Sequence, residues 1–329
     1  MLKKLAPYLI LFTISLFLAY KASLPEEGRT LSSVKWFEAE GKLSKVFYKK
    51  ASKLELTILP HENGYFAREQ LFTEGKPTST SSFKTSQRFL EFAQSFKPFY
   101  VKRVIGKVDK EKKTRFGFFD DPKKQTILEL HHEKTPKKTF QIGHRSFGSS
   151  QIYLFDEDQG EALLVDSRPF DDLDKAKTKM INRLVHKIAL KDIEEVAIKK
   201  DTQKALWKHN QKEKRFYDAK KGDAKESGSY LTWIEKIGKL RVLSYLDASS
   251  HKELLTKTPL FSLELLSKTQ AAEKITFWKI EKGAKGPLAS PGKTTYFVLS
   301  SHLQRAAKVS SNRLEPLDKD LSNLLLTNE

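Results

Sequence analysis

Residues 126–167 read TILELHHEKTPKKTFQIGHRSFGSSQIYLFDEDQGEALLVDS, and this stretch decides the expected fold class. Four runs within it alternate apolar and polar residues: TILELHH, KTFQIG, QIYLFD and ALLVDS. Alternation with a period of two is typical of strands that are buried on one face. The segments between the runs are rich in Gly, Ser, Pro and Asp, which favour turns. The stretch therefore predicts an antiparallel meander.

The residues before this meander predict two more strands and a helix. KLELTIL (53–59) and YFAREQ (65–70) alternate like strands and are joined by the turn PHENG. The polar stretch GKPTSTSSFKTS leads into an expected helix from Phe83 to Phe96, and FYVKRVI (99–105) is the next expected strand. The expected helix carries its apolar residues on one stripe. The residues of that stripe are Phe89, Leu90, Phe92 and Phe96.

A similar order of elements returns 141 residues later, where Tyr230, Leu231, Trp233 and Ile237 repeat the same spacing. DIEEVAIKK and KALWKHN are expected strands, SYLTWIEKIGKL is an expected helix, and RVLSYL is the strand after it. LFSLELLSK, KITFWKI and TTYFVLS follow as further expected strands. The shared order favours a tandem repeat. The alternative is a chance likeness between two amphipathic helices.

The predicted fold class is α+β. An N-terminal transmembrane helix is followed by two tandem, related α/β halves with mainly antiparallel sheets. The predicted domains are the anchor (1–22), a first α+β repeat with a joining helix (23–190), and a second α+β repeat with a C-terminal tail (191–329). The joining helix is expected over Asp171–Ala189.

The N-terminus reads MLKKLAPYLILFTISLFLAYKAS and holds no charged residue from Leu5 to Tyr20. Sixteen helical residues reach about 24 Å, slightly less than the roughly 30 Å hydrocarbon core. A signal peptidase site with small residues is not evident, so a retained anchor is expected, with a cleaved signal peptide as the alternative. Lys3 and Lys4 precede the run and favour a cytoplasmic N-terminus. The prediction is a single-pass protein of the bacterial inner membrane, with the bulk of the chain periplasmic.

The composition is strongly basic, with a net charge of +19 and 48 lysines among 60 basic residues. Such a lysine excess is typical of a solvated surface, since arginine is the usual choice for bidentate recognition of phosphate or carboxylate. The alternative is contact with anionic lipid or cell-wall polymer. Nucleic acid is not expected as a partner. The candidate contact residues lie in VKRVIGKVDKEKKTR and are Lys102, Arg103, Lys107, Lys110, Lys112, Lys113 and Arg115.

Several motifs imitate catalytic or metal sites without completing them. GPLASPGKTT (286–295) lacks the first glycine of a phosphate loop, where Pro287 stands, and strand-forming residues follow it instead of a helix. Ser-x-x-Lys pairs occur about as often as chance predicts and lack their partner motifs. His131 and His132 are adjacent, so on a strand they face opposite sides. DEDQGE (156–161) lacks the glycine of a calcium loop. The prediction is a protein that is not an enzyme and has no cofactor or metal.

The segments FGFFDDPKKQTILEL, FQIG, IYLF and LLVDS resemble an exported family described only as a domain of unknown function. Its members share an aromatic-Gly-aromatic/Leu-Asp-Pro turn before a strand, and then a short strand that ends in Ile-Gly. Here Phe119 is an additional residue before the Asp pair. The family places are held by Phe116, Gly117, Phe118, Asp121, Pro122, Ile142 and Gly143.

This resemblance covers roughly Leu54 to Leu246. It implies an N-terminal span, repeated α/β halves and genes that often lie beside gliding-motility-type ABC transporter subunits. It carries no catalytic residues.

The resulting hypothesis is a non-catalytic, membrane-anchored periplasmic accessory protein of an ABC-type transport or motility complex, with integral-membrane transporter subunits as partners. The alternative is a module that binds envelope polymer or an anionic lipid surface.

Overall fold

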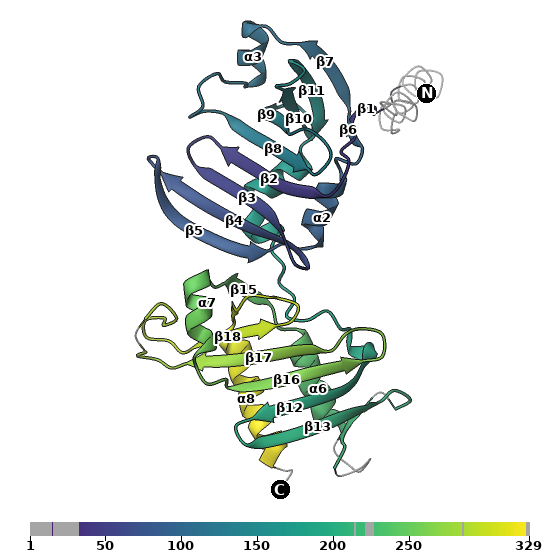
Figure 1. Ribbon diagram of the computed structural model, residues 1–329, viewed down its shortest axis with the longest axis vertical. Coiled ribbons are helices and arrows are strands. Elements are labelled where there is room, and N and C mark those ends of the chain that lie inside the picture. The colour runs from purple at the N-terminus through teal and green to yellow at the C-terminus, as the bar shows by residue number, and fades with distance from the viewer. Residues whose placement is uncertain (1–14, 16–32, 214, 221–226, 285, 327–329) are drawn as a thin grey trace, which may run out of the picture.

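The computed structural model describes residues 15, 33–213, 215–220, 227–284 and 286–326. The chain is mainly β, with 45% strand and 22% helix, and its sheets are antiparallel. Two large sheets lie one beyond the other along the long axis of the molecule (Figure 1). The predicted α+β class, with a transmembrane helix and two α/β halves, is therefore wrong, although the antiparallel sheets were expected.

The first sheet contains nine strands of the described chain. In spatial order they are β5 (Lys76–Lys84), β4 (Gly64–Thr73), β3 (Leu54–His61), β2 (Leu43–Lys50), β8 (Thr126–His132), β9 (Lys138–Arg145), β10 (Gln151–Asp156), β11 (Glu161–Asp166) and β7 (Arg103–Lys107). Strands β1 (Val34–Phe37) and β6 (Phe99–Val101) pair separately. The predicted meander over 126–167 is confirmed, because β8 to β11 pair antiparallel in chain order.

The second sheet contains eight strands within the described ranges. In spatial order they are β14 (Arg215–Asp218), β13 (Gln203–Asn210), β12 (Ile193–Lys200), β16 (Phe261–Ser267), β17 (Glu273–Ile280), β18 (Thr295–Ser300), β19 (Ala307–Val309) and β15 (Val242–Tyr245). Alternate side chains of β12 point to opposite faces, as the pleat requires. Val196 and Ile198 are buried, whereas Lys199 is exposed.

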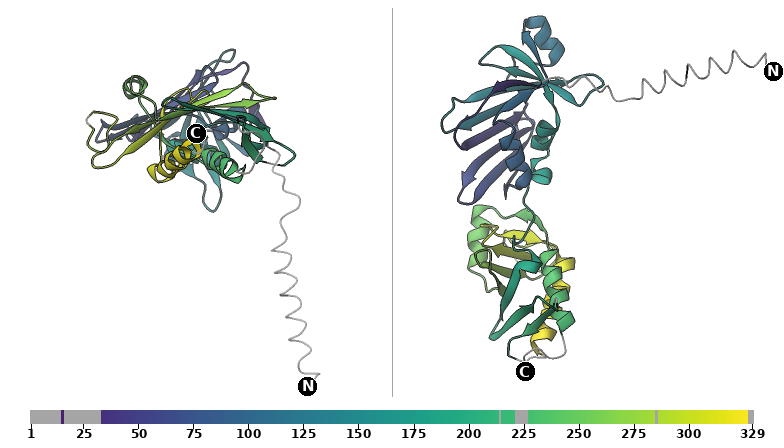
Figure 2. Two further views of the ribbon diagram at one scale, coloured as in Figure 1. Left: turned by 90° about the horizontal axis from the view of Figure 1, so that it is seen from below. Right: turned by 90° about the vertical axis from the view of Figure 1, so that its right-hand side faces the viewer.

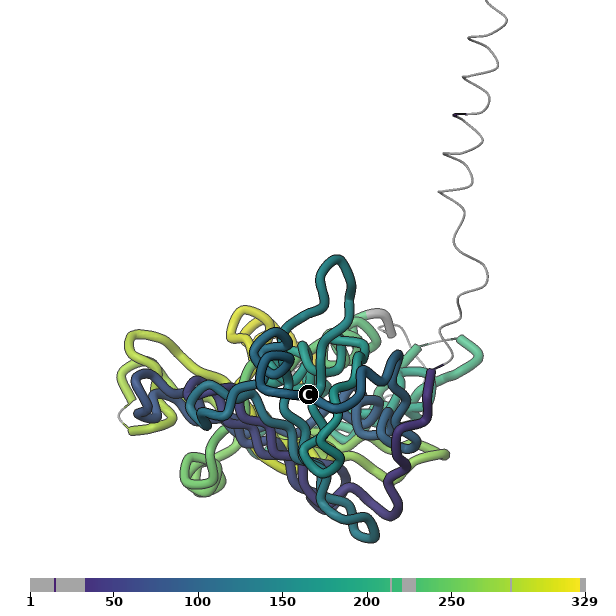
Figure 3. Tube along the Cα trace, turned by 90° about the horizontal axis from the view of Figure 1, so that it is seen from above, coloured from purple at the N-terminus to yellow at the C-terminus, as the bar shows by residue number. Residues whose placement is uncertain are grey.

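Helices pack on both faces of the sheets, most of them on one face. They are α2 (Gln87–Gln94), α3 (Lys110–Phe116), α4 (Arg168–Asp174), α5 (Ala176–Lys179), α6 (Ser227–Gly238), α7 (Ala248–Leu255) and α8 (Ser311–Leu326), with a 3-10 turn η1 (Leu190–Asp192). Helices α6 and α8 pack together on the second sheet, and α2 lies on the same side of the first sheet (Figure 2). The two halves overlap when viewed along the long axis (Figure 3). The opposite faces carry one helix each, α3 on the first sheet and α7 on the second, and each contributes to a small apolar cluster separate from the main one.

The buried apolar residues beneath the helices form one continuous cluster that runs through both sheets. In the first half it includes Phe89 and Phe92 of α2, and in the second half Trp207 and Trp233. At the meeting point of the sheets, the rings of Phe66 and Tyr245 lie edge to face at 6.2 Å. The domain boundaries expected at residues 22 and 190 stay predictions.

Two segments differ from the predicted secondary structure because tertiary pairing uses their backbone groups. Residues expected to lead into the helix form β5, where Phe83 and Lys84 pair with Ala67 and Phe66, so α2 begins only at Gln87. The helix expected over 171–189 ends at Lys179. Beyond it the chain is extended and makes isolated bridges to both halves, Thr85 to Ile181 and Leu184 to Arg241.

The expected single-pass inner-membrane protein with a periplasmic bulk is not supported. No helix in the described ranges is long and apolar enough to cross a membrane. The longest of these helices, α8, has 16 residues and carries Asp318, Lys319 and Asp320, because it buries one face and exposes the other. The run Leu5–Tyr20 lies outside the described residues, apart from Ser15.

Trp233→Ala is expected to destabilise the protein by about 3–5 kcal/mol, the usual cost of removing a large buried aromatic side chain. Trp233 is 2% exposed, its ring contacts Trp207, and its Nε1 donates to the carbonyl of Leu317 at 2.8 Å. Urea unfolding measures the loss. Phe147→Ala is the control, since Phe147 is fully exposed and its removal should stay within about 0.5 kcal/mol. Equal stability of the two variants would contradict this packing.

Candidate functional site

The predicted family motif lies where helix α3 meets strand β9. Gly117 is the C-cap of α3 and takes a left-handed conformation with φ of 80°. Phe116 and Phe118 on either side of it are buried in a small cluster with Ala162. A side chain at Gly117 would collide with the ring of His144, since an added Cβ lies 2.4 Å from its Cδ2. The glycine is therefore required both for the turn and for close approach.

Gly143, on β9, is required where that strand approaches the main chain of α3. A Cβ added there would lie 2.2 Å from the carbonyl oxygen of Phe116. Its neighbour Ile142 is 7% exposed. The side chain of Asp121 accepts from the N–H of Lys123 and shapes the turn into β8. Pro122 is exposed in that turn. The structure thus brings the motif residues together as a joint between α3, the turn and β9.

The predicted basic segment covers the β7 edge of the first sheet and helix α3, at the end far from the second sheet (Figure 1). Three of its seven cations have acidic neighbours: Lys107 to Glu161 at 3.9 Å, Lys112 to Asp109 at 3.5 Å, and Lys113 to Asp120 at 2.8 Å. The other four are solvent-facing and form no ion pair within the described chain. They are Lys102, Arg103, Lys110 and Arg115.

A buried polar cluster, which we call the junction cluster, joins the two sheets. It consists of Lys84, Asn182, Glu273 and His302, which are 4–8% exposed. The ammonium of Lys84 donates to the carbonyl of His302, and the main-chain carbonyl of Lys84 accepts from the N–H of Asn182 at 2.8 Å. Burial lowers the pKa of Lys84, and the nearby Lys187 lowers it further. One lysine therefore bonds to two segments that are distant in sequence.

The other members of the junction cluster are also bonded. The amide of Asn182 donates to Nε2 of His302 at 2.7 Å, which requires a neutral imidazole. Burial lowers the pKa of His302 to about 4, in agreement with this bond. Glu273 accepts from the main-chain N–H of Lys187 at 3.0 Å, while burial raises its pKa. A hollow of about 320 Å³ adjoins these residues.

Sequence reasoning missed the junction cluster. Its members lie at positions 84, 182, 273 and 302, in four separate segments, and no spacing rule connects them. The one available signal is Lys84 in an alternating strand pattern, at a position that faces the core side. This signal is useful only if β5 is predicted as a strand, because only then does Lys84 fall on the buried face.

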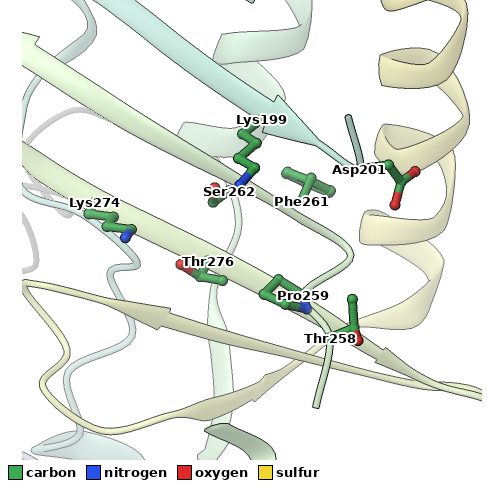
Figure 4. A pocket seen from close by; sticks show the side chains of 8 residues that line it. All are labelled: Lys199, Asp201, Thr258, Pro259, Phe261, Ser262, Lys274 and Thr276. Atoms are coloured by element: carbon green, nitrogen blue, oxygen red, sulfur yellow. The ribbon is translucent and has the colours of Figure 1, made fainter. Parts of the chain in front are cut away.

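Two adjoining hollows, of about 320 and 600 Å³, lie on the open face of the second sheet. Both are lined by Lys199, Ser262 and Lys274, which come from the neighbouring strands β12, β16 and β17 (Figure 4). Thr276 stands beside Ser262, and the two are cross-strand partners. These side chains provide cations and hydroxyl groups, which bind anionic groups without chemistry on them.

The histidines and acids of the described chain do not gather into a metal site. No group of three or more His, Asp or Glu side chains is placed to hold a metal ion in the ranges that the structure covers. His131 contacts Glu129 at 3.3 Å, whereas its neighbour His132 is buried on the other face of β8. Residues 156–161 form the hairpin turn between β10 and β11.

Gly143→Ala is expected to destabilise the protein by several kcal/mol, because its Cβ meets a main-chain oxygen that cannot move without displacing α3. Gly238→Ala is the matched control. Its added Cβ lies 3.6 Å from His186, an ordinary contact, at the end of α6, so the change should be within about 1 kcal/mol. Denaturant unfolding compares the two. Similar midpoints for both variants would show that the joint is loose.

Stability is expected to fall as the pH drops from about 6.5 to about 4. The unfolded imidazole of His302 has a pKa near 6.5, and in the folded protein its pKa is about 4. Between these values the unfolded state binds a proton that the folded state does not, so acid favours unfolding. Urea unfolding across this range, with His302→Gln as comparison, should show a shallower dependence in the variant. His132, His186 and His251, whose pKa values burial also lowers, contribute to the slope that remains in the variant. If wild type and variant lose stability equally with falling pH, His302 does not contribute to the pH dependence.

Comparison with known proteins gave one match, to a family model. The model described as "Domain of unknown function (DUF4340)" matches residues 91–259, just over half of the chain. The matched range contains the whole joint between α3 and β9, and it continues through Asn182 of the junction cluster into the second sheet. No curated protein and no solved structure matches the chain. The expectation of a family described only as a domain of unknown function is confirmed, and the chain belongs to the DUF4340 family.

Proposed function

We propose that this protein is a non-catalytic accessory subunit of an ABC-type transport or motility complex, and that it works by binding partner proteins. Its partners are integral-membrane transporter subunits. The protein contributes a platform of two sheets whose open faces and edges carry the contacts.

The observation that carries this proposal is the use of the junction cluster. Buried titratable groups are common in active sites. Here, however, they form hydrogen bonds to main-chain groups where the two halves meet. Lys84 donates to a carbonyl of the 301–304 turn, and Glu273 accepts from the main chain at Lys187. Tyr245 donates to the carbonyl of Asn182 at 2.9 Å. These bonds support a role in holding the sheets in one arrangement.

The surfaces support binding as the mode of action. Most helices lie on one side of each sheet (Figure 2), so much of the other side is left to the side chains of the strands. The lining of the hollows on the second sheet includes lysine, serine and threonine side chains, which can bind charged and polar groups of a partner. The resemblance to a family encoded beside transporter subunits adds the identity of the partner class.

Mild detergent extraction of cells that carry the tagged protein is expected to return transporter subunits together with it. Stable interfaces bury enough surface to survive such a purification. Mass spectrometry compares the eluate with that of an unrelated tagged protein of similar net charge. This comparison controls for proteins that bind non-specifically because the net charge of the chain is +19. A tagged protein that returns alone, with every transporter subunit at the level of this control, would contradict the proposal.

The second candidate is a module that binds envelope polymer or an anionic lipid surface. It is favoured by the four solvent-facing cations on the β7 edge and on α3, which form no ion pair within the described chain. Such contacts are screened by salt. The pairing of Lys107, Lys112 and Lys113 with acids weakens this candidate.

A further inference from the structure

The open face of the second sheet carries lysines that oppose one another. In the strand register, Lys199 of β12 lies directly opposite Lys204 of β13. Like charges in this arrangement repel and destabilise a sheet. On the other side of Lys199 stands Ser262, followed by Thr276 on β17. Lys274 is two residues from Thr276 on the same face, opposite Glu264. Asp201 and Glu264 also line the two hollows, but the lysines there, which include Lys220, outnumber these acids, so the surface carries net positive charge beside hydroxyl groups.

Several other lysines of this half have acidic partners. Lys208 pairs with Glu195 at 3.2 Å, Lys268 with Glu194 at 2.7 Å, and Lys200 with Asp318 at 2.6 Å. By contrast, the ammonium groups of Lys199, Lys204 and Lys274 form no ion pair and no hydrogen bond with any residue that the structure describes. Their ammonium groups are therefore available to a partner.

The fold recesses this part of the sheet. Further along the same face, Leu254 of α7 and Leu288 pack on Trp278 and Phe297 in a separate apolar cluster. That cover stops short of β12, β13 and β16, where the two hollows lie. Leu206 and Ala197 form a partly exposed apolar floor beside the lysines. The surface is thus a shallow polar trough with a small apolar base.

We propose that this lysine trough, formed by Lys199, Lys204 and Lys274 around Ser262 and Thr276, docks an acidic segment of a partner protein. The proposal rests on the proposed function, since it names the kind of surface that such a partner presents. Lysine ammonium groups are point charges that suit scattered carboxylates, whereas planar bidentate recognition of phosphate favours arginine.

The test uses the full-length protein in mild detergent and a fluorescein-labelled oligoglutamate peptide as the probe. Fluorescence anisotropy at low salt is expected to show binding that weakens as salt is added. The combined substitutions Lys199→Glu, Lys204→Glu and Lys274→Glu should raise Kd by at least about tenfold, a loss of about 1.4 kcal/mol. The matched control combines Lys102→Glu, Lys110→Glu and Arg115→Glu, which changes net charge equally on the first half, and it should bind as wild type does.

A single variant distinguishes loss of peptide binding from loss of folding. Lys204→Glu places a carboxylate opposite Lys199, which replaces repulsion with attraction across the strands. We expect this variant to bind the peptide more weakly and to unfold at a higher denaturant midpoint. Equal weakening by the control combination, or undiminished binding by the trough combination, would overturn the proposal. Capture of phosphatidylserine vesicles through the trough lysines, with no binding of the peptide, would also overturn it.

The same variants distinguish this inference from the proposed function. If the trough combination still returns transporter subunits from detergent extracts, the accessory role stands and the trough is not the docking surface. If the wild-type protein returns alone while the peptide binds through the trough, the accessory role fails and the trough remains an acidic-segment site.

Discussion

Lys84 is 4% exposed, and its ammonium donates to the carbonyl of His302, 218 residues further along the chain. Removing a cation from water is costly unless polar groups replace the lost hydration. Lys84 therefore holds the end of β5 against the turn after β18, and its own carbonyl receives the N–H of Asn182. Three segments that are remote in sequence meet at this one residue. The placement of one sheet relative to the other depends on them.

Apolar contacts continue through the same junction, but they are less directional. Phe66 and Tyr245 touch edge to face, and the main apolar cluster extends into both halves. Hydrophobic burial favours contact without selecting one geometry, whereas a fully satisfied polar network rigidifies and specifies an arrangement. The neutral imidazole of His302 belongs to this network, because a protonated ring loses the bond from Asn182. Acid therefore acts on the place where the two sheets are joined.

Charge has different meanings on the two halves. The basic segment on β7 and α3 is conspicuous in the sequence, yet three of its cations have acidic neighbours. The lysines of β12, β13 and β17 are dispersed along the sequence, yet the register gathers them on one face. Whether a lysine is neutralised depends on which side chains come within reach of its ammonium in the fold. A count of charges along the chain does not report that.

The sequence alone determined the antiparallel meander over 126–167, because alternation with a period of two is a local property that survives folding. It also identified Gly117 and Gly143, since glycine marks backbone positions that tolerate no side chain. It misjudged residues 75–86 and 180–189, where weak local preferences gave way to pairing with distant strands. The expected membrane span at Leu5–Tyr20 lies outside the described residues apart from Ser15, and no described helix takes that role.

Only the tertiary structure decided the junction cluster and the lysine trough. Both consist of residues that become neighbours through strand order and register, and those are set by the packing of the whole chain and not by spacing within it.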